Sequence, residues 1–347
     1  MNGSECPFIS EKLCSIQQRL GEEFLSKTCA TYPRTINVVD DMMERSLDLS
    51  CPEAARLVLS DPNPAQLQLA AVTNLEADQD KKQTAIKGSQ YARPARDLIL
   101  SILQDRKYPV SKRLILVGHV CDKLSEIAQN GTEITIPKVL NGFACAINAG
   151  MFNAHLNQCS ADPAIQLGLV LELIVSRIKL DFTPKRYLNL HQEFMEGLEF
   201  KTGSTVGELG IRYAEACDRY YAPFMHGHEY MMEHYLVNYA YKRMFPFGSS
   251  ATNQLLGLDR IDNPIVAQYI LMATHYAITR AVMIGLAGKY KSEFGVDHVI
   301  RCVQSCARML EHCTSYPARV LELLSSKGIT NTAGMAILTQ DFRAVDR

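Results

Sequence analysis

The sequence lacks an excess of charge of either sign. Its 347 residues include 36 Lys and Arg against 37 Asp and Glu, which gives a formal net charge of −1. Proteins that bind nucleic acids usually carry a basic excess, so a nucleic-acid partner is not expected. The chain also opens without the basic and apolar regions of a secretory signal. Because eleven cysteines occur without such a signal, we expect reduced thiols in a cytoplasmic protein, which disfavours disulfides.

Several common nucleotide-binding and catalytic motifs are absent. No strand leads into G-x-G-x-x-G with a ribose-binding acid, so a Rossmann site is not visible. Residues 114–118 come nearest and lack the other glycines. A P-loop and the H-E-x-x-H zinc motif are missing as well. A doubly wound nucleotide-binding domain is therefore not expected.

Uninterrupted apolar runs and strand-like alternation are scarce. The most apolar stretch, Ile265 to Leu286, contains Gln268, His275 and Arg280, so we expect a buried helix and no membrane segment. Because period-two alternation is rare, a large sheet is not expected. Helical spacing between Pro and Gly breakers dominates the rest. The predicted helices span residues 94–106, 110–129, 136–156, 163–180, 185–199, 205–222, 228–244, 264–289, 295–314 and 317–326.

The sequence divides into three parts. Residues 1–60 carry four cysteines and read as short helices and loops, residues 61–92 form a polar linker, and residues 93–347 form a helical body. In the first part, Ser10 could cap a helix that Gly21 ends. We therefore predict an all-α fold without a Rossmann sheet, in which an N-terminal cysteine-rich module packs on a multi-helix body.

The first part holds Cys6, Cys14, Cys29 and Cys51, separated by seven, fourteen and twenty-one residues. This spacing lacks the tight C-x2-C pairs of most zinc sites and the common ferredoxin pattern. The residues alone therefore leave three interpretations open: buried packing, a zinc or iron–sulfur site, and disulfides. Pro52 suits the first turn of a helix, which places Cys51 beside a helix N-terminus that favours a thiolate.

Residues 226–239 hold a second concentration of functional groups. Its polar side chains share one broad helix face, opposite an apolar stripe of Met, Tyr and Leu. The members of that face are Glu229, Glu233, His234 and Asn238. The stretch also offers four side chains of metal-binding type: His226, His228, Glu233 and His234. An ordinary solvated helix face is the third interpretation.

These two regions resemble a known family. The first contains CPF, LC-x-IQ, GEEFLSKTC, TYPR and ERSL-x-LSCPEAARL, and the second runs from HYLVNY into MFPF. In this order and separation, over roughly residues 6–250, they resemble the bacterial flagellin lysine-N-methylases, a group with a cysteine-rich domain that chelates zinc or iron. The family's further cysteine-rich segment, upstream of the first block, is not part of this sequence.

The resemblance implies transfer of methyl groups from S-adenosylmethionine to lysine side chains of flagellin. It implies a thiolate-held [4Fe–4S] cluster, with zinc as the alternative, and no membrane partner. The implied metal ligands are Cys6, Cys14, Cys29 and Cys51. Two alternatives remain: a zinc-stabilised module that binds flagellin without catalysis, and a related enzyme that acts on a small-molecule amine.

The implied chemistry suggests two further sets of residues. A guanidinium suits the carboxylate of the methyl donor, and an aromatic ring suits its adenine, although an internal Arg–Glu pair explains the arginines equally well. The expected donor-binding residues are Tyr32, Arg34 and Arg45. The substrate ammonium, with a pKa of about 10.4 in water, must lose a proton before it attacks. The residues expected to bind and position that lysine are Glu229, Glu233, Tyr230 and Asn238.

Overall fold

The structure is a computed structural model, and it is mostly helical. It describes residues 6–11, 13–39, 42–63, 65, 91–130, 135–180 and 182–342. Within these residues the strands form two separate antiparallel pairs, so the expected absence of a large sheet agrees with the arrangement that is described. Most of the predicted linker lies outside the described residues.

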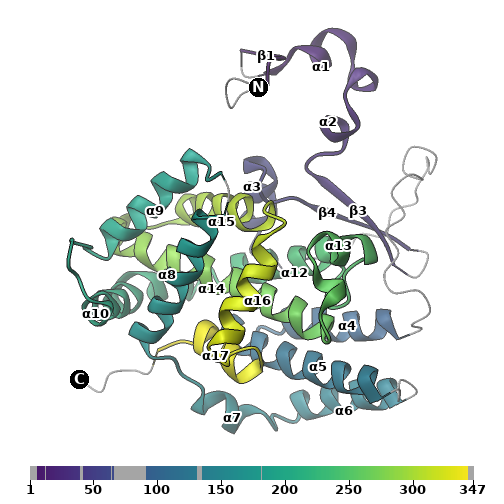
Figure 1. Cartoon of the computed structure of the whole chain (residues 1–347), viewed down its shortest axis with the longest axis vertical. Helices are drawn as coiled ribbons and strands as arrows, with labels where there is room; N and C mark the ends of the chain where they lie inside the picture. The colour runs from purple at the N-terminus through teal and green to yellow at the C-terminus, as the bar shows by residue number, and fades with distance from the viewer. Residues whose placement is uncertain are drawn as a thin grey trace.

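The N-terminal segment contains short elements. They are β1 (Ile9–Ser10), β2 (Leu13–Cys14), α1 (Ser15–Leu20), η1 (Glu22–Phe24), α2 (Lys27–Thr31), β3 (Arg34–Val39), β4 (Met42–Leu47) and α3 (Pro52–Ser60). In Figure 1, the part with β1, α1 and α2 extends away from the helical body, whereas β3, β4 and α3 lie against it. The predicted cysteine-rich module is therefore not packed on the body as one unit.

Most of the predicted helices occur in the helical body, which also contains helices over 250–255 and 332–339 that were not predicted. Its helices are α4 (Ala92–Leu103), α5 (Val110–Asn130), α6 (Ile136–Asn148), α7 (Asn153–Gln158), α8 (Pro163–Ile178), α9 (Lys185–Gly197), α10 (Val206–Ala216), α11 (Ala222–Met225), α12 (Tyr230–Arg243), α13 (Ser250–Leu255), α14 (Pro264–Tyr290), α15 (Val296–Glu311), α16 (Tyr316–Ser326) and α17 (Thr332–Thr339). A π-helical turn, η4 (Cys217–Tyr221), joins α10 to α11, and short turns η5 (Leu258–Arg260) and η6 (Lys291–Glu293) flank α14.

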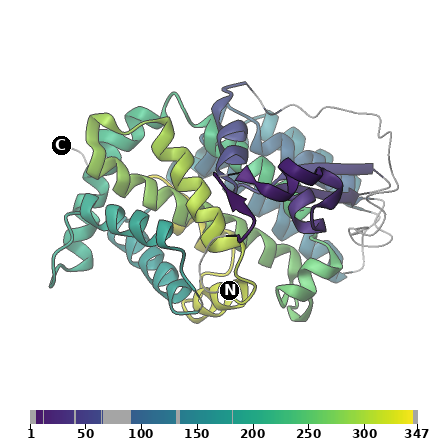
Figure 2. The same cartoon turned by 90° about the horizontal axis from the view of Figure 1, so that it is seen from above.

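Helix α14 is the central element of the body. Every residue from Ile265 to Ala287 is buried, and α5, α9, α15 and α17 pack around it (Figures 1 and 2). A helix that is apolar on all sides is stable only when it is enclosed in this way. It is the one helix in the described part of the chain that is long and apolar enough to cross a membrane, and its apolar window is wholly buried in the protein. The prediction of a buried core helix is confirmed.

Helices α9 and α14 touch along their backbones. A Cβ atom on Gly197 would lie 1.8 Å from the carbonyl oxygen of Gly285. A Cβ atom on Gly285 would in turn lie 2.3 Å from the ring of Phe194. The two helices can cross at this short separation because neither glycine carries a side chain.

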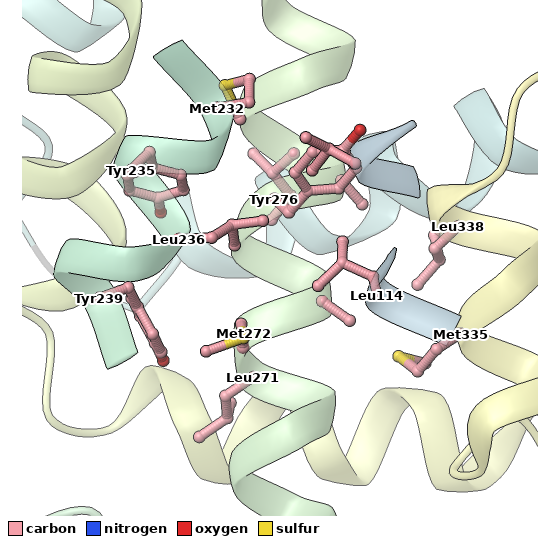
Figure 3. Close-up of a cluster of buried hydrophobic side chains, with 14 of the residues drawn as sticks. Leu114, Met232, Tyr235, Leu236, Tyr239, Leu271, Met272, Tyr276, Met335 and Leu338 are labelled. Atoms are coloured by element: carbon pink, nitrogen blue, oxygen red, sulfur yellow. The ribbon is translucent and has the colours of Figure 1, made fainter. Parts of the chain in front are cut away.

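Helix α12 joins this core to the N-terminal segment. Its inner side packs on α14 and contributes to a cluster that also includes α5 and α17 (Figure 3). The labelled members from α12 are Met232, Tyr235, Leu236 and Tyr239. Its outer side contacts α3, α4 and β4. The interpretation of this stretch as a solvated helix face is therefore wrong for Glu233 and His234, which are 0% and 4% exposed.

Three local predictions differ from the structure. Ser10 does not cap a helix but belongs to β1, and Cys14 precedes α1. The helix predicted over 136–156 is broken into α6 and α7, because Gly150 adopts a positive φ of 70°. The hairpin of β3 and β4 was predicted as short helices and loops. By contrast, α3 begins at Pro52 with Cys51 as its N-cap, as expected.

Candidate functional site

A pocket of about 690 Å³ lies where the N-terminal segment meets the body. Its walls come from β4, the end of α3 and the turn that follows, the residue after α4, and α12. Helix α12 contacts each of α3, α4 and β4 (Figure 1). The lining residues are Arg45, Ser46, Leu47, Leu57, Val58, Asp61, Asn63, Ala65, Gln104, His234, Val237, Asn238 and Tyr241. A volume of this size is typical of sites for small molecules.

Asn238 fixes the hairpin to α12 at the edge of this pocket. Its side-chain amide donates to the Leu47 carbonyl at 2.8 Å, and its oxygen accepts from the Leu47 amide at 3.1 Å. Asn37, on β3, donates to the carbonyls of Tyr241 and Lys242 at the end of α12. The predicted residue Asn238 therefore lines the pocket, and its polar atoms hold β4 in place.

The two predicted arginines share one face of the hairpin. Ile36 lies opposite Arg45, and Arg34 lies opposite Leu47. Because alternate residues of a strand point to the same side, Arg34 and Arg45 are diagonal neighbours on that face. Arg45 is exposed and lines the pocket, whereas Arg34 is exposed and donates at 3.4 Å to the Ala30 carbonyl outside it.

Tyr32 lies outside the pocket lining. Its hydroxyl is 3.1 Å from the Ser50 hydroxyl, and burial raises the pKa of its phenol. Among the described residues, neither Arg34 nor Arg45 makes the Arg–Glu pair considered from the sequence. Glu44 instead pairs with Arg96 of α4 at 2.5 Å, and Glu53 pairs with Arg56 at 2.6 Å. The structure thus places one of the three expected donor-binding residues at the pocket.

Glu233 is enclosed behind the pocket wall by two arginines. Arg113 Nη1 donates to Glu233 Oε2 at 2.8 Å. Arg106 donates from Nε and Nη2 to both oxygens of the same carboxylate, each at 2.9 Å. A carboxylate held by two guanidinium groups is neutralised where it stands. A lysine would have to displace an arginine to reach Glu233. The surroundings of Glu233 therefore do not favour the predicted direct contact with the substrate lysine.

Glu229 and Tyr230 lie at the start of α12, away from the pocket lining. Glu229 Oε1 accepts from the amide of Val110 at 2.8 Å, one of the unpaired donors at the beginning of α5. Burial raises the pKa of Glu229, although its side chain is still partly exposed. The ring of Tyr230 meets the ring of His234 edge to face, with 5.8 Å between centroids. The roles assigned to Glu229 and Tyr230 stay predictions.

His234, Asp61 and Ser46 line the pocket and were not assigned to it from the sequence. From the sequence, His234 was considered as a metal ligand, because the sequence shows how closely it follows other residues of metal-binding type. The sequence does not show that His234 lies beside α3. Asp61 follows the last residue of α3, and the Asn63 backbone amide holds the pKa of its carboxyl below the usual range. The hydroxyl of Ser46 is buried and makes no hydrogen bond to any described residue.

The four N-terminal cysteines do not form a metal site in the described structure. Cys14 precedes α1, Cys29 lies within α2, Cys51 caps α3, and all are free thiols. No group of three or more His, Cys, Asp or Glu in the described ranges has the arrangement needed for a metal ion. The described residues as placed do not fit an iron–sulfur cluster or zinc, and the ligand set stays a prediction.

Comparison with known proteins identifies the helical body. A family model described as the FliB lysine N-methylase C-terminal domain matches residues 96–338, well over half of the chain. The α12 side of the pocket, with His234 and Asn238, lies within the match, and the β4 and α3 side precedes it. No solved structure matches the chain.

Curated relatives match over a shorter stretch. A flagellar biosynthetic protein FliU of Salmonella muenchen is 38% identical over 63 residues, which cover 18% of this chain and 37% of the relative. Lysine-N-methylases of Salmonella typhimurium and Salmonella choleraesuis are also 38% identical over 63 residues, 18% of this chain and 16% of each relative. The matches thus span well under half the length of these relatives. The chain belongs to the FliB lysine N-methylase family, and its helical body corresponds to the C-terminal domain of that family.

Proposed function

We propose that this protein transfers methyl groups from S-adenosylmethionine to lysine side chains of flagellin, and that the pocket between β4 and α12 is the reaction site. The observation that carries the proposal is the meeting of Arg45 and Asn238 in one pocket wall. These residues come from the two sequence regions that carry the family resemblance, nearly two hundred residues apart. Membership of a lysine N-methylase family supports the reaction class.

The pocket suits the chemical groups of the methyl donor. Its volume of about 690 Å³ falls in the usual range for small-molecule and cofactor sites. The Arg45 guanidinium can bind the donor carboxylate through two parallel hydrogen bonds. The ring of Tyr241 lines the same pocket and offers an aromatic face to the cationic sulfonium. Leu47, Leu57 and Val237 supply apolar wall that excludes water.

The lysine enters from the side of Asp61. This carboxylate is exposed at the pocket, where it attracts the ammonium group of a protein side chain. After the ammonium loses a proton, its nitrogen lone pair attacks the methyl carbon. The bond between that carbon and sulfur breaks, its electron pair stays on sulfur, and a neutral thioether leaves. The product is a methylated amine, which takes the positive charge.

Flagellin as the protein substrate is supported by the names of the relatives. One is a flagellar biosynthetic protein and two are lysine-N-methylases, each matched over a small share of its length. The proposal does not depend on an iron–sulfur cluster.

Methyl transfer from radiolabelled S-adenosylmethionine to purified flagellin tests the proposal. The intact protein should label lysines, and Arg45→Met should weaken donor binding about tenfold or more, because a charge-assisted hydrogen-bond pair contributes about 1.5–3 kcal/mol. Arg56→Met is the matched control: this exposed arginine of α3 pairs with Glu53 outside the pocket and should leave donor binding unchanged.

Three outcomes would contradict the proposal. Flagellin binding without donor binding would indicate a module that does not catalyse. Labelling of free amines but not of flagellin would indicate a small-molecule substrate. Equal donor affinity in the Arg45 and Arg56 variants would place the donor outside this pocket.

A further inference from the structure

We infer that His234 is the base that takes the proton from the substrate lysine. The inference rests on the proposed function and identifies a residue that acts in the same pocket. His234 is 4% exposed and lines the pocket wall, one residue after the arginine-bound Glu233.

The hydrogen bond at Nδ1 fixes the tautomer of His234. Nδ1 lies 2.9 Å from the carbonyl oxygen of Val58. A carbonyl oxygen can only accept, so Nδ1 must carry the hydrogen. Val58 is in the last turn of α3, where the carbonyls have no partner within the helix, so this contact also satisfies the helix end. In the neutral ring Nε2 is then the unprotonated nitrogen, with its lone pair available.

Nε2 has no partner in the described structure. It is buried and receives no hydrogen bond from any of the described residues. Leaving a buried acceptor unpaired costs about 1–3 kcal/mol, which a hydrogen-bond donor on a ligand or a water would recover. A ligand in the pocket can supply that partner, and the ammonium of a lysine is a donor of the right kind.

Charged groups from several elements lie near His234. Glu233 Oε1 lies 3.9 Å from Nε2, and Arg106 and Arg113 hold that carboxylate in place. From the other elements around the pocket, Asp61 and Arg45 face the same space. Because the two arginines already neutralise its carboxylate, Glu233 adds no net negative charge beside Nε2.

Proton transfer to His234 precedes methyl transfer to the lysine nitrogen. The lysine ammonium gives one proton to His234 Nε2, and the N–H bonding pair becomes the nitrogen lone pair. That pair forms the bond to the methyl carbon while the carbon–sulfur bond breaks. The imidazolium releases its proton to water after the methylated product leaves, which restores the neutral ring.

His234→Asn separates the base from the structural contact. The Asn amide nitrogen can replace Nδ1 as the donor to Val58, but nothing replaces Nε2. We expect kcat to fall by about 10²–10⁴-fold, the usual contribution of a general base. Donor binding should stay within about twofold of the native protein. The activity that remains should rise with pH, because the lysine then loses its proton to solvent. His226→Asn, at an exposed histidine outside the pocket lining, is the control.

The results separate this inference from the proposed function. If the native protein does not methylate flagellin, the proposed function fails. If the native protein is active and His234→Asn keeps its kcat and its pH profile, the base is not His234. As a test that needs no folded variant, nitrogen-15 NMR of the native protein should show Nδ1–H and an unprotonated Nε2; a hydrogen on Nε2 would overturn the inference.

Discussion

Glu233 shows how a single residue can have the right chemistry for one role and the wrong surroundings for it. From the sequence, its carboxylate on a helix face is a reasonable partner for a lysine. In the structure it receives hydrogen bonds from Arg106 and Arg113, at positions 127 and 120 residues away along the chain. No pattern within α12 indicates those arginines. The neighbouring His234 carries the unpaired atom instead.

We predict that replacing one of these arginines, in Arg113→Met, is strongly destabilising. Arg113 is 2% exposed, and it also donates to the carbonyls of Leu103 and Tyr108. The substitution removes one of the two guanidinium groups that neutralise the buried Glu233 and leaves the two carbonyls without this donor, so we expect a cost of about 3–5 kcal/mol. Urea unfolding followed by circular dichroism measures the loss. Arg106→Met should lower the free energy of unfolding clearly less, because the Arg106 side chain is 39% exposed. Equal losses in the two variants would show that burial of the arginine does not determine its contribution to stability.

Single helices were the most predictable elements. Long segments between Pro or Gly residues, such as α8 from Pro163 and α14 from Pro264, begin and end within a few residues of the predicted positions. The hairpin of β3 and β4 could not be predicted in this way, because its stability comes from contacts with Asn238 and the end of α12. Isolated two-stranded hairpins are marginal in water.

The pocket was predictable only in part, for the same reason. Arg45 and Asn238 were both selected from the sequence, yet their proximity depends on the hairpin. Asp61 and His234 meet through the end of α3. The sequence pattern shows which residues have side chains suited to catalysis or binding. It does not show which of these side chains are already occupied by contacts with residues far away in the chain.

For the helix pair α9 and α14 we predict that Gly285→Ala is destabilising. The new methyl group would meet the ring and the backbone oxygen of Phe194 at 2.3 Å and 2.8 Å, and the second is a backbone atom that cannot simply rotate away. Overpacking of a core costs about 1–3 kcal/mol, so the melting temperature should fall.

Gly142→Ala is the control for that substitution. Gly142 lies within α6, is exposed, and has open space where a Cβ atom would be placed. Alanine favours a helix interior by about 0.5–1 kcal/mol over glycine, so this variant should melt at a slightly higher temperature. If Gly285→Ala were also stabilising, the close contact between α9 and α14 would be wrong.

In the molecule as a whole, one charged cluster ties the N-terminal segment to the body. The ammonium of Lys242, at the end of α12, lies 2.9 Å from carboxylate oxygens of both Asp48 and Glu311. His312 approaches Asp48 at 3.2 Å. Burial raises the pKa of the Asp48 carboxyl, but the contacts with His312 and Lys242 outweigh it, so that pKa lies well below its usual range. The pKa of Glu311 is lowered as well, because Lys242 and Arg243 outweigh the effect of burial.

This cluster predicts a dependence of stability on pH. Because the two carboxyl pKa values are lower in the folded protein, their contribution is complete above the unfolded values of about 4 and is lost as the pH falls further. Thermal unfolding should therefore show little change in this contribution from about pH 6 to pH 5 and a steep loss of stability below about pH 4. Lys242→Met should lower stability at neutral pH and flatten that acid dependence. Lys123→Met removes an exposed pair with Glu126 and should change stability by less than about 1 kcal/mol. An unchanged acid slope in Lys242→Met would argue against the cluster.

The two hydrogen bonds between Leu47 and Asn238 also set an order of events during synthesis. The 191 positions between them mean that β4 leaves the ribosome long before its partner on α12 exists. At about 5–20 residues per second, the hairpin waits roughly 10–40 s with its docking side uncovered. The pocket is thus among the last features to assemble. A fragment cut to residues 96–338, the range that matches the family domain, would lack the wall that carries Arg45 and would have no complete pocket for the methyl donor.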